Sequence, residues 1–214
     1  MTINFNNKLV TWSLLVGLVP GLSGCFTAAV VGVGAGVLMV SDRRTSDTYL
    51  TDEAIELRAL NGISEKYNTT VHVNVTSFNR MVLITGEVPD AAIKADVSRI
   101  VESKPNVKAV QNELKISGSS GLGARSNDTL ITSKVKGRFV DYGKFSAHIV
   151  KVVTEGGIVY LMGLVTRNEG DAATEIARST SGVLSVVRLF EYISEDEAKR
   201  LDNRPTEEPK AQVR

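Results

Sequence analysis

The sequence has few of the residues that build disulfides, metal centres and catalytic sites. Its 214 residues include one cysteine and two histidines. A single cysteine excludes intramolecular disulfides and cysteine-based zinc sites. The patterns H-E-x-x-H, G-x-S-x-G and Walker A are absent. The formal net charge is +1, whereas a general nucleic-acid binder has a strong excess of basic residues. We therefore expect no catalytic residue, no bound metal and no nucleic-acid partner.

The first 24 residues are typical of a secretory signal peptide. Lys8 precedes an apolar run from Leu9 to Leu22, and small residues lead to Cys25 in the sequence Leu22-Ser23-Gly24-Cys25. A small-residue site that ends in the only cysteine resembles a bacterial lipobox, in which that cysteine is acylated and begins the mature chain. This resemblance implies a covalent lipid at Cys25, with palmitate among the expected acyl chains, and no other cofactor.

The residue after Cys25 indicates in which membrane a lipoprotein is retained. It is Phe26, whereas lipoproteins retained in the inner membrane typically carry Asp at this position. The resemblance thus favours the outer membrane, with the protein facing the periplasm. Residues 26–40 are uncharged but shorter than the roughly 20 residues that span a bilayer. An uncleaved anchor that joins them to the signal stays open as an alternative. We interpret residues 25–49 as a lipidated tether.

The rest of the chain contains an internal repeat of about 68 residues. VLITGEV at 82–88 aligns with VYLMGLV at 159–165, which places Gly86 on Gly163. We interpret these two as structural glycines, at a bulge or a site of close packing. Positions upstream also match, at an offset one residue shorter: Asp52, Ile55 and Ile63 align with Asp128, Ile131 and Phe139. Downstream, Val107 and Val110 align with Val183 and Val186.

Each copy predicts the same order of elements, αββαβ. An amphipathic helix (about 51–66 and 128–142) precedes two strands, an Ala-rich helix and a final strand (107–116 and 183–193). The expected fold class is α+β, with two tandem modules that each pack two helices on a small mixed three-stranded sheet. The expected domains are residues 50–117 and 128–194, joined by a Gly/Ser-rich linker at 118–127. We expect the tail, residues 195–214, to be disordered.

The histidines offer no clear site. His72 and His148 occupy equivalent positions of the two copies. We therefore interpret them as inherited strand positions rather than as a catalytic or metal-binding pair.

The repeated unit resembles the BON domain, through its V-x-(I/L)-x-G-x-V strand, Ala-rich second helix and final strand near Val-x-x-Val. A lipobox followed by two such units is similar to the dual-BON-domain outer-membrane lipoproteins of Gram-negative bacteria. The sequence Asp42-Arg43-Arg44-Thr45 ahead of the first unit also resembles that group. The resemblance implies a non-enzymatic envelope protein whose second BON domain binds phospholipid.

The first helices of the two copies differ in charge. Acidic residues outnumber basic ones in the first copy, and basic residues outnumber acidic ones in the second. On a helical wheel, Ile131, Val135, Phe139 and Tyr142 form one stripe, which we expect to face the sheet. An adjacent stripe, expected to face solvent, consists of Leu130, Lys134, Gly137 and Arg138. It suits anionic phospholipid headgroups, although an ordinary solvated helix face is the alternative.

Two functions remain in competition. The first is an outer-membrane lipoprotein that binds anionic phospholipid through its second module and supports envelope integrity. The second is a periplasmic adaptor that docks protein partners such as the outer-membrane assembly machinery. A hydrolase has little support in the residues.

Overall fold

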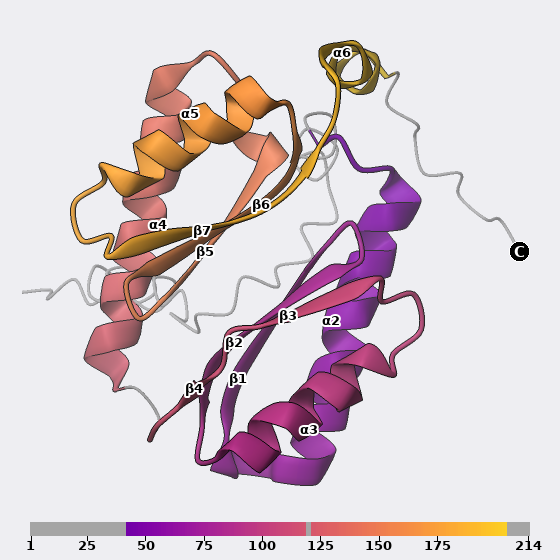
Figure 1. Ribbon diagram of the computed structural model, residues 1–214, viewed down its shortest axis with the longest axis vertical. Helices are drawn as coiled ribbons and strands as arrows, with labels where there is room; N and C mark the ends of the chain where they lie inside the picture. The colour runs from indigo at the N-terminus through magenta and orange to yellow at the C-terminus, as the bar shows by residue number, and fades with distance from the viewer. Residues whose placement is uncertain (1–41, 119–120, 205–214) are drawn as a thin grey trace, which may run out of the picture. The chain divides into compact units, whose positions relative to one another are not determined.

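The computed structural model describes residues 42–118 and 121–204 (Figure 1). Cys25, the signal peptide and the apolar run at 26–40 lie outside these residues. Within the described part of the chain, no helix is long and apolar enough to cross a bilayer.

The first module, residues 46–116, has the predicted order of elements. The hairpin strands β1 and β2 pair antiparallel, and β3 and β4 both run parallel to β2 on its other side. The elements are α2 (Ser46–Tyr67), the short 3₁₀ helix η1 (Asn68–Thr70), β1 (His72–Phe78), β2 (Met81–Val88), α3 (Ala91–Glu102), β3 (Ala109–Asn112) and β4 (Lys115–Ile116).

The second module, residues 122–192, repeats this order. Its sheet has the strand order β5-β6-β7, with β5 antiparallel and β7 parallel to the central β6. The elements are α4 (Leu122–Tyr142), η2 (Ala147–Ile149), β5 (Val150–Glu155), β6 (Ile158–Val165), α5 (Arg167–Arg178) and β7 (Ser185–Tyr192). The fold class is therefore the predicted one, two tandem αββαβ modules.

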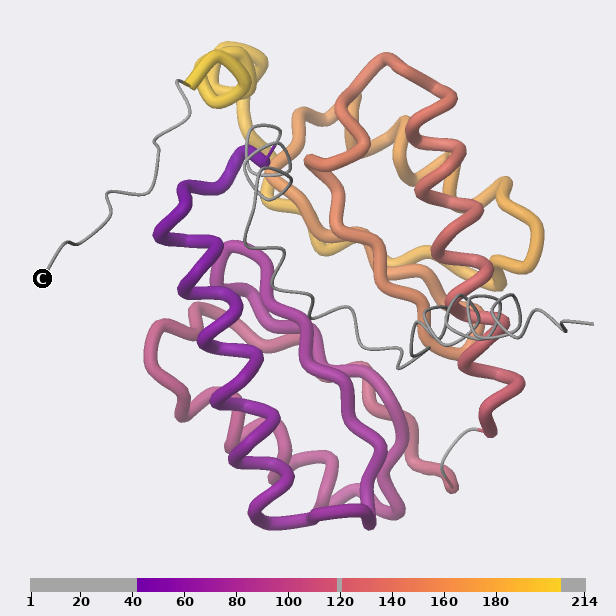
Figure 2. Tube along the Cα trace, turned by 180° about the vertical axis from the view of Figure 1, so that it is seen from behind, coloured from indigo at the N-terminus to yellow at the C-terminus, as the bar shows by residue number. Residues whose placement is uncertain are grey.

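Both helices of each module cover one face of its sheet, as the two opposite views show (Figures 1 and 2). The alternation of side chains along the central strand builds this core. In β2, Val82, Ile84 and Val88 pack with residues of α2 and α3, such as Ile55 and Val97. In β6, the equivalent residues Val159, Leu161 and Val165 pack with residues of α4 and α5, such as Phe139 and Ala173.

The two central strands are buried on their second face as well. Leu83 of β2 belongs to one apolar cluster with Tyr160, Met162 and Leu164 of β6, and all four are at most 8% exposed. Phe78 at the end of β1 joins them. The two sheets thus share a core between the modules, which belong to one compact unit. The repeat pattern predicted a separate core for each copy and gave no indication of this contact.

An aspartate on the first helix of each module binds the turn of the β-hairpin. Asp52 on α2 accepts hydrogen bonds from the backbone N–H groups of Asn79 and Arg80, both at 2.8 Å. Asp128 on α4 does the same for Gly156 and Gly157, again at 2.8 Å. The repeat has therefore preserved a specific link between helix and turn, at positions that the sequence alignment had matched.

The two structural glycines lie at close contacts with the neighbouring strand. A Cβ atom at Gly86 would fall 2.1 Å from the carbonyl oxygen of His72, and the backbone angle φ of Gly86 is +114°. At Gly163 the added atom would fall 2.5 Å from the carbonyl oxygen of Ile149. Neither position can hold a larger residue without a shift of backbone.

The strand pairing corrects the alignment of the histidines. Val73 pairs with Gly86, and Val150 pairs with Gly163. His72 is therefore equivalent to Ile149 and not to His148, because the shorter offset that holds for the first helices does not extend to the hairpin. A slip of one residue reverses the face of a strand on which a side chain lies. His148 lies in η2 and is exposed.

Two segment boundaries differ from the expected ones. α4 begins at Leu122, inside the segment that the sequence analysis interpreted as a linker. The tail is also not disordered from residue 195, because α6 spans Glu195–Asp202. Ser194 caps this helix through its side chain, and Ala198 is buried.

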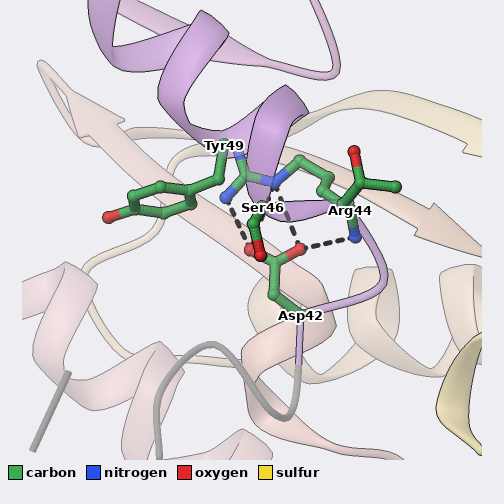
Figure 3. A pocket seen from close by; sticks show the side chains of 5 residues that line it. Asp42, Arg44, Ser46 and Tyr49 are labelled. Carbon is green, nitrogen blue, oxygen red and sulfur yellow. Dashed lines mark hydrogen bonds and ion pairs between the residues drawn. The ribbon is translucent and has the colours of Figure 1, made fainter. Parts of the chain in front are cut away.

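Two consecutive arginines ahead of α2 contact different modules. Arg43, 4% exposed, donates to Glu169, to Asp202 and to the carbonyl oxygen of Leu164. Arg44 instead pairs with Asp42 and Asp52. In Figure 3 the guanidinium of Arg44 lies beside Asp42, and Tyr49 of α2 lies nearby. It also lies over the rings of Tyr49 and Phe78, 5.0 and 4.2 Å from their centroids. The Asp42-Arg43-Arg44 segment therefore holds both modules.

Candidate membrane-binding face

The outward side of α4 carries the residues predicted to contact phospholipid. Its inward side is fixed by the core, because Ile131, Val135 and Phe139 are at most 1% exposed. Tyr142, the fourth residue predicted on this side, is instead 39% exposed. Leu130, on the other side, is 52% exposed. Lys134, Gly137 and Arg138 are exposed as well. The helix therefore presents the predicted stripe to solvent. An exposed leucine beside cations is compatible with a membrane surface, but by itself it does not distinguish one from a solvated face.

Gly137 leaves an open place on this side of the helix. A Cβ atom built there would meet nothing within 4 Å. The glycine is thus not required by packing within the chain, in contrast to Gly86 and Gly163. Because Gly137 has no side chain, another molecule can approach the helix backbone there. A glycine in a helix costs about 1 kcal/mol relative to alanine.

Arg138 has a structural role that the sequence did not suggest. Its Nη1 atom donates to the carbonyl oxygen of Ile176 at 2.8 Å and to the hydroxyl of Thr180 at 2.8 Å. Ile176 lies in the last turn of α5, where carbonyl groups lack partners within the helix. Arg138 therefore joins α4 to the C-terminal end of α5, and its positive charge there is favourable.

A shallow recess lies beside these residues. Its volume is about 340 Å³, and it is lined by Lys134, Gly137, Arg138 and Asp141 of α4 and by Ser179, Thr180 and Ser181 after α5. Lys134, Arg138 and the Ser181 hydroxyl offer hydrogen-bond donors to an anionic oxygen. The hydroxyl groups of Ser179 and Thr180 already donate to backbone carbonyl groups of α5. The recess thus combines the predicted basic residues with polar groups from a second segment of the chain.

The sequence analysis missed two apolar residues on the same exposed side. Val140 is 67% exposed and Leu122 is 81% exposed. Val140 and Leu122 each lie about 80° from Leu130 on the helical wheel, in the direction away from Lys134. Lys136, also exposed, lies beyond them. The periodicity could have revealed Val140, because the wheel places it in the half of the helix opposite Phe139 and Val135. Leu122 could not be placed on the wheel while its segment was interpreted as a linker.

The first helix of the other module offers a comparison. α2 also exposes leucines, with Leu50 at 60%, Leu57 at 62% and Leu60 at 38%. Acidic residues are in the majority among its exposed charged residues, which are Asp47, Glu53 and Glu65 against Arg58 and Lys66. Apolar exposure is therefore common to both helices, and the sign of the surrounding charge is what distinguishes α4.

One set of residues in the described part of the chain could hold a metal ion. It consists of His72 and Glu87 of the first module and Glu155 of the second. Neither the helix face nor the recess contains such a set within the described residues.

Two tandem αββαβ modules of this topology define a protein with a duplicated small α+β domain. The BON domain family matches residues 51–118 and 127–194, which coincide with the two modules. The chain belongs to the BON domain family. The resemblance of the chain to the dual-BON-domain outer-membrane lipoproteins is confirmed by a relative that is more than 30% identical over most of this chain.

That relative is the outer membrane lipoprotein DolP of Haemophilus influenzae, 32% identical over 195 residues, which are 90% of this chain and 100% of that protein. A 21 kDa hemolysin of Actinobacillus pleuropneumoniae is 29% identical over 71% of this chain and 79% of that protein. The osmotically-inducible protein Y of Escherichia coli K12 is 23% identical over 74% of this chain and 81% of that protein.

Proposed function

We propose that the protein is an outer-membrane lipoprotein, anchored through Cys25 and facing the periplasm, which binds anionic phospholipid through the outward side of α4. It supports envelope integrity in this way and catalyses no reaction. The observation that carries the proposal is the exposure of Leu130 and Val140, at 52% and 67%, on the outward side of α4. The exposed Lys134 and Lys136 lie at the two opposite edges of this side. The equivalent helix of the first module has an acidic surface.

The magnitudes favour a weak interfacial contact. Full burial of a Val or Leu side chain contributes about 1.5–3 kcal/mol. Each Lys or Arg near an anionic bilayer contributes about 1 kcal/mol. The sum of two apolar and two basic side chains is enough to orient a protein that its lipid anchor already holds at the membrane. It is also small enough to depend strongly on salt.

The recess beside α4 suits the lipid headgroup. A phosphate oxygen placed there would face the Lys134 ammonium and the hydroxyl group of Ser181. Gly137 would let the headgroup approach the helix backbone, since a Cβ atom there has open space. The acyl chains would then lie toward Leu130 and Val140, at the membrane surface.

Vesicle flotation of the chain from Asp42 onward, without the lipid anchor, tests this proposal. The protein should float with vesicles that contain phosphatidylglycerol and should not float with phosphatidylcholine vesicles. Binding should weaken as salt rises. Lys134→Glu with Lys136→Glu should abolish flotation, because both charges are reversed on the exposed side. These positions are better tests than Arg138, whose replacement would also remove the link to α5.

The matched control is Arg58→Glu, an exposed cation on α2. It should float as the wild type does. Equal flotation of the α4 double variant and the wild type would contradict the proposal, as would a wild type that binds neither kind of vesicle.

Anchoring has its own test. Cys25→Ala should prevent labelling with a palmitate analogue and should release the protein from membranes, since one acylated residue supplies the chains that insert. Undiminished labelling of the variant would show that the lipobox interpretation is wrong.

The adaptor function has one specific observation in its favour. Leu50 and Leu57 lie seven residues apart on one side of α2, at 60% and 62% exposure, among acidic side chains. An acidic apolar face is repelled by an anionic membrane but can pack against a protein. Site-specific photo-crosslinking from position 57 in cells would detect such a partner, and position 130 would serve as the comparison.

A further inference from the structure

Three side chains that could ligate a metal meet where the two modules contact each other. His72 begins β1, Glu87 lies near the end of β2, and Glu155 ends β5. Their donor atoms all lie within 4.8 Å of one another. The Nδ1 atom of His72 is 2.8 Å from Oε2 of Glu87. The cluster therefore brings two strands of one module and one strand of the other to a single point.

The two carboxylates are almost fully removed from solvent. Glu87 is 7% exposed and Glu155 is 6% exposed. Burial disfavours a carboxylate charge, and a second like charge nearby disfavours it further. A cation bound between such groups relieves both costs.

The acidic residues of this region raise the pKa of a neighbouring tyrosine. Burial, together with the carboxylates of Glu113 and Glu155, raises the pKa of Tyr160 to about 12.

We propose that His72, Glu87 and Glu155 form a binding site for a divalent transition metal, best suited to Zn²⁺, that bridges the two BON domains. Zinc accepts one imidazole nitrogen and carboxylate oxygens at about 2.0–2.2 Å, with water as a fourth ligand. Magnesium and calcium prefer six or more oxygen ligands, so a set with an imidazole nitrogen favours a transition metal.

The surroundings support a built site. The Nδ2 atom of Asn74 donates to Oε2 of Glu155 at 3.0 Å, which fixes the orientation of that carboxylate. Hydrogen-bond partners of this kind orient metal ligands and affect affinity. The His72 side chain is 20% exposed, so an ion and its water can reach the cluster.

The placement of the ligands has a mechanical consequence. His72 and Glu87 belong to the first module and Glu155 to the second. A metal that binds all three therefore stabilises the folded arrangement in which the modules are in contact, by mass action. The site would couple the zinc level of the envelope to the rigidity of the protein.

Zinc binding to the full-length protein, purified in detergent without a polyhistidine tag, tests this proposal. Calorimetry should give one equivalent of Zn²⁺, and Co²⁺ should produce visible absorption bands. His72→Asn and Glu155→Gln should each weaken zinc binding at least about tenfold. The matched control is His148→Asn, which makes the same change at the exposed histidine outside the cluster and should bind zinc as the wild type does.

Thermal unfolding distinguishes a loss of zinc binding from a general loss of stability. Added Zn²⁺ should raise the Tm of the wild type and of His148→Asn, and should not raise that of His72→Asn or Glu155→Gln. Asn74→Ala keeps all three ligands and should weaken binding about tenfold. The proposal is overturned if the wild type binds no zinc, if these cluster variants bind it as tightly as the wild type, or if His148→Asn loses it equally.

Discussion

Arg43 and Glu169 form a two-bond ion pair, with Nη1 2.7 Å from Oε2 and Nη2 2.8 Å from Oε1. The pair joins the residues ahead of the first module to the second helix of the second module. Glu169 also completes the capping box of α5 with Thr166. The same guanidinium donates to Asp202 of α6. One buried cation therefore joins the segment ahead of α2 to α6.

We expect Arg43→Ala to lower the free energy of unfolding by about 3 kcal/mol, because it leaves a partly buried carboxylate and a buried carbonyl oxygen without their donor. Urea denaturation of the chain from Asp42 onward would measure the change. Arg188→Ala is the control, since Arg188 and Asp171 form an ion pair with both side chains at least half exposed. It should cost less than about 1 kcal/mol. Equal costs would mean that the Arg43 contacts add no more than surface pairs.

The ion pair also predicts a dependence on pH. Burial raises the pKa of the Glu169 carboxyl, but hydrogen bonds from Arg43 and Thr166 outweigh it and hold that pKa below its ordinary value of 4.5. The unfolded chain therefore takes up this proton first as the pH falls. The stabilising contribution is full at neutral pH and is lost as the pH falls from about 4.5 through the lower pKa of the folded state.

Glu169→Gln tests this dependence. Its free energy of unfolding should lie well below that of the wild type at pH 7, and the difference should shrink at pH 3. Denaturation curves at a series of pH values would measure it. A difference that is constant from pH 7 to pH 3 would mean that the carboxylate charge does not stabilise the fold.

The duplicated aspartates predict parallel effects in the two modules. Asp128→Asn should destabilise the protein by about 2 kcal/mol, because an amide cannot accept both turn hydrogen bonds and lacks the charge that strengthens them. Asp52→Asn should cost at least as much, since Asp52 also binds Ser77 and Arg44. Asp141→Asn, at an exposed position of the same helix as Asp128, should have little effect. Thermal unfolding of the three variants would decide.

The sequence was sufficient for the order of elements within each module. Gly86 and Gly163 marked the central strands, and the 3.6-residue period identified the core sides of the first helices. The shared core was not predicted, although a signal for it exists. Val82-Leu83-Ile84 and Val159-Tyr160-Leu161-Met162 are continuous apolar runs, as expected of a strand that is buried on both faces. Their partner surface, however, is distant in sequence, and periodicity does not reveal it.

For the candidate membrane-binding face, the sequence predicted only which side of α4 is exposed. The wheel of α4 gave the exposed stripe because helix periodicity is local. The role of Arg138 at the end of α5 and the cluster around His72 depend on contacts between elements far apart in the chain. The histidines also required the strand register, which the insertion of one residue between helix and hairpin had shifted. Local sequence patterns thus predicted the helices, the strands and their exposed sides. Which side chains meet depends on contacts between segments that are far apart in the chain.

The contact of α4 with the membrane can be observed directly by tryptophan fluorescence. The only tryptophan of the sequence is Trp12, so the chain from Asp42 onward has none. Leu130→Trp places a single fluorophore on the exposed side of α4, and Leu57→Trp places one at a similarly exposed position of α2. With phosphatidylglycerol vesicles, we predict a blue shift and quenching by brominated acyl chains at position 130 and neither at position 57. No response at position 130, or an equal response at both positions, would contradict the assignment of α4 as the membrane-binding helix.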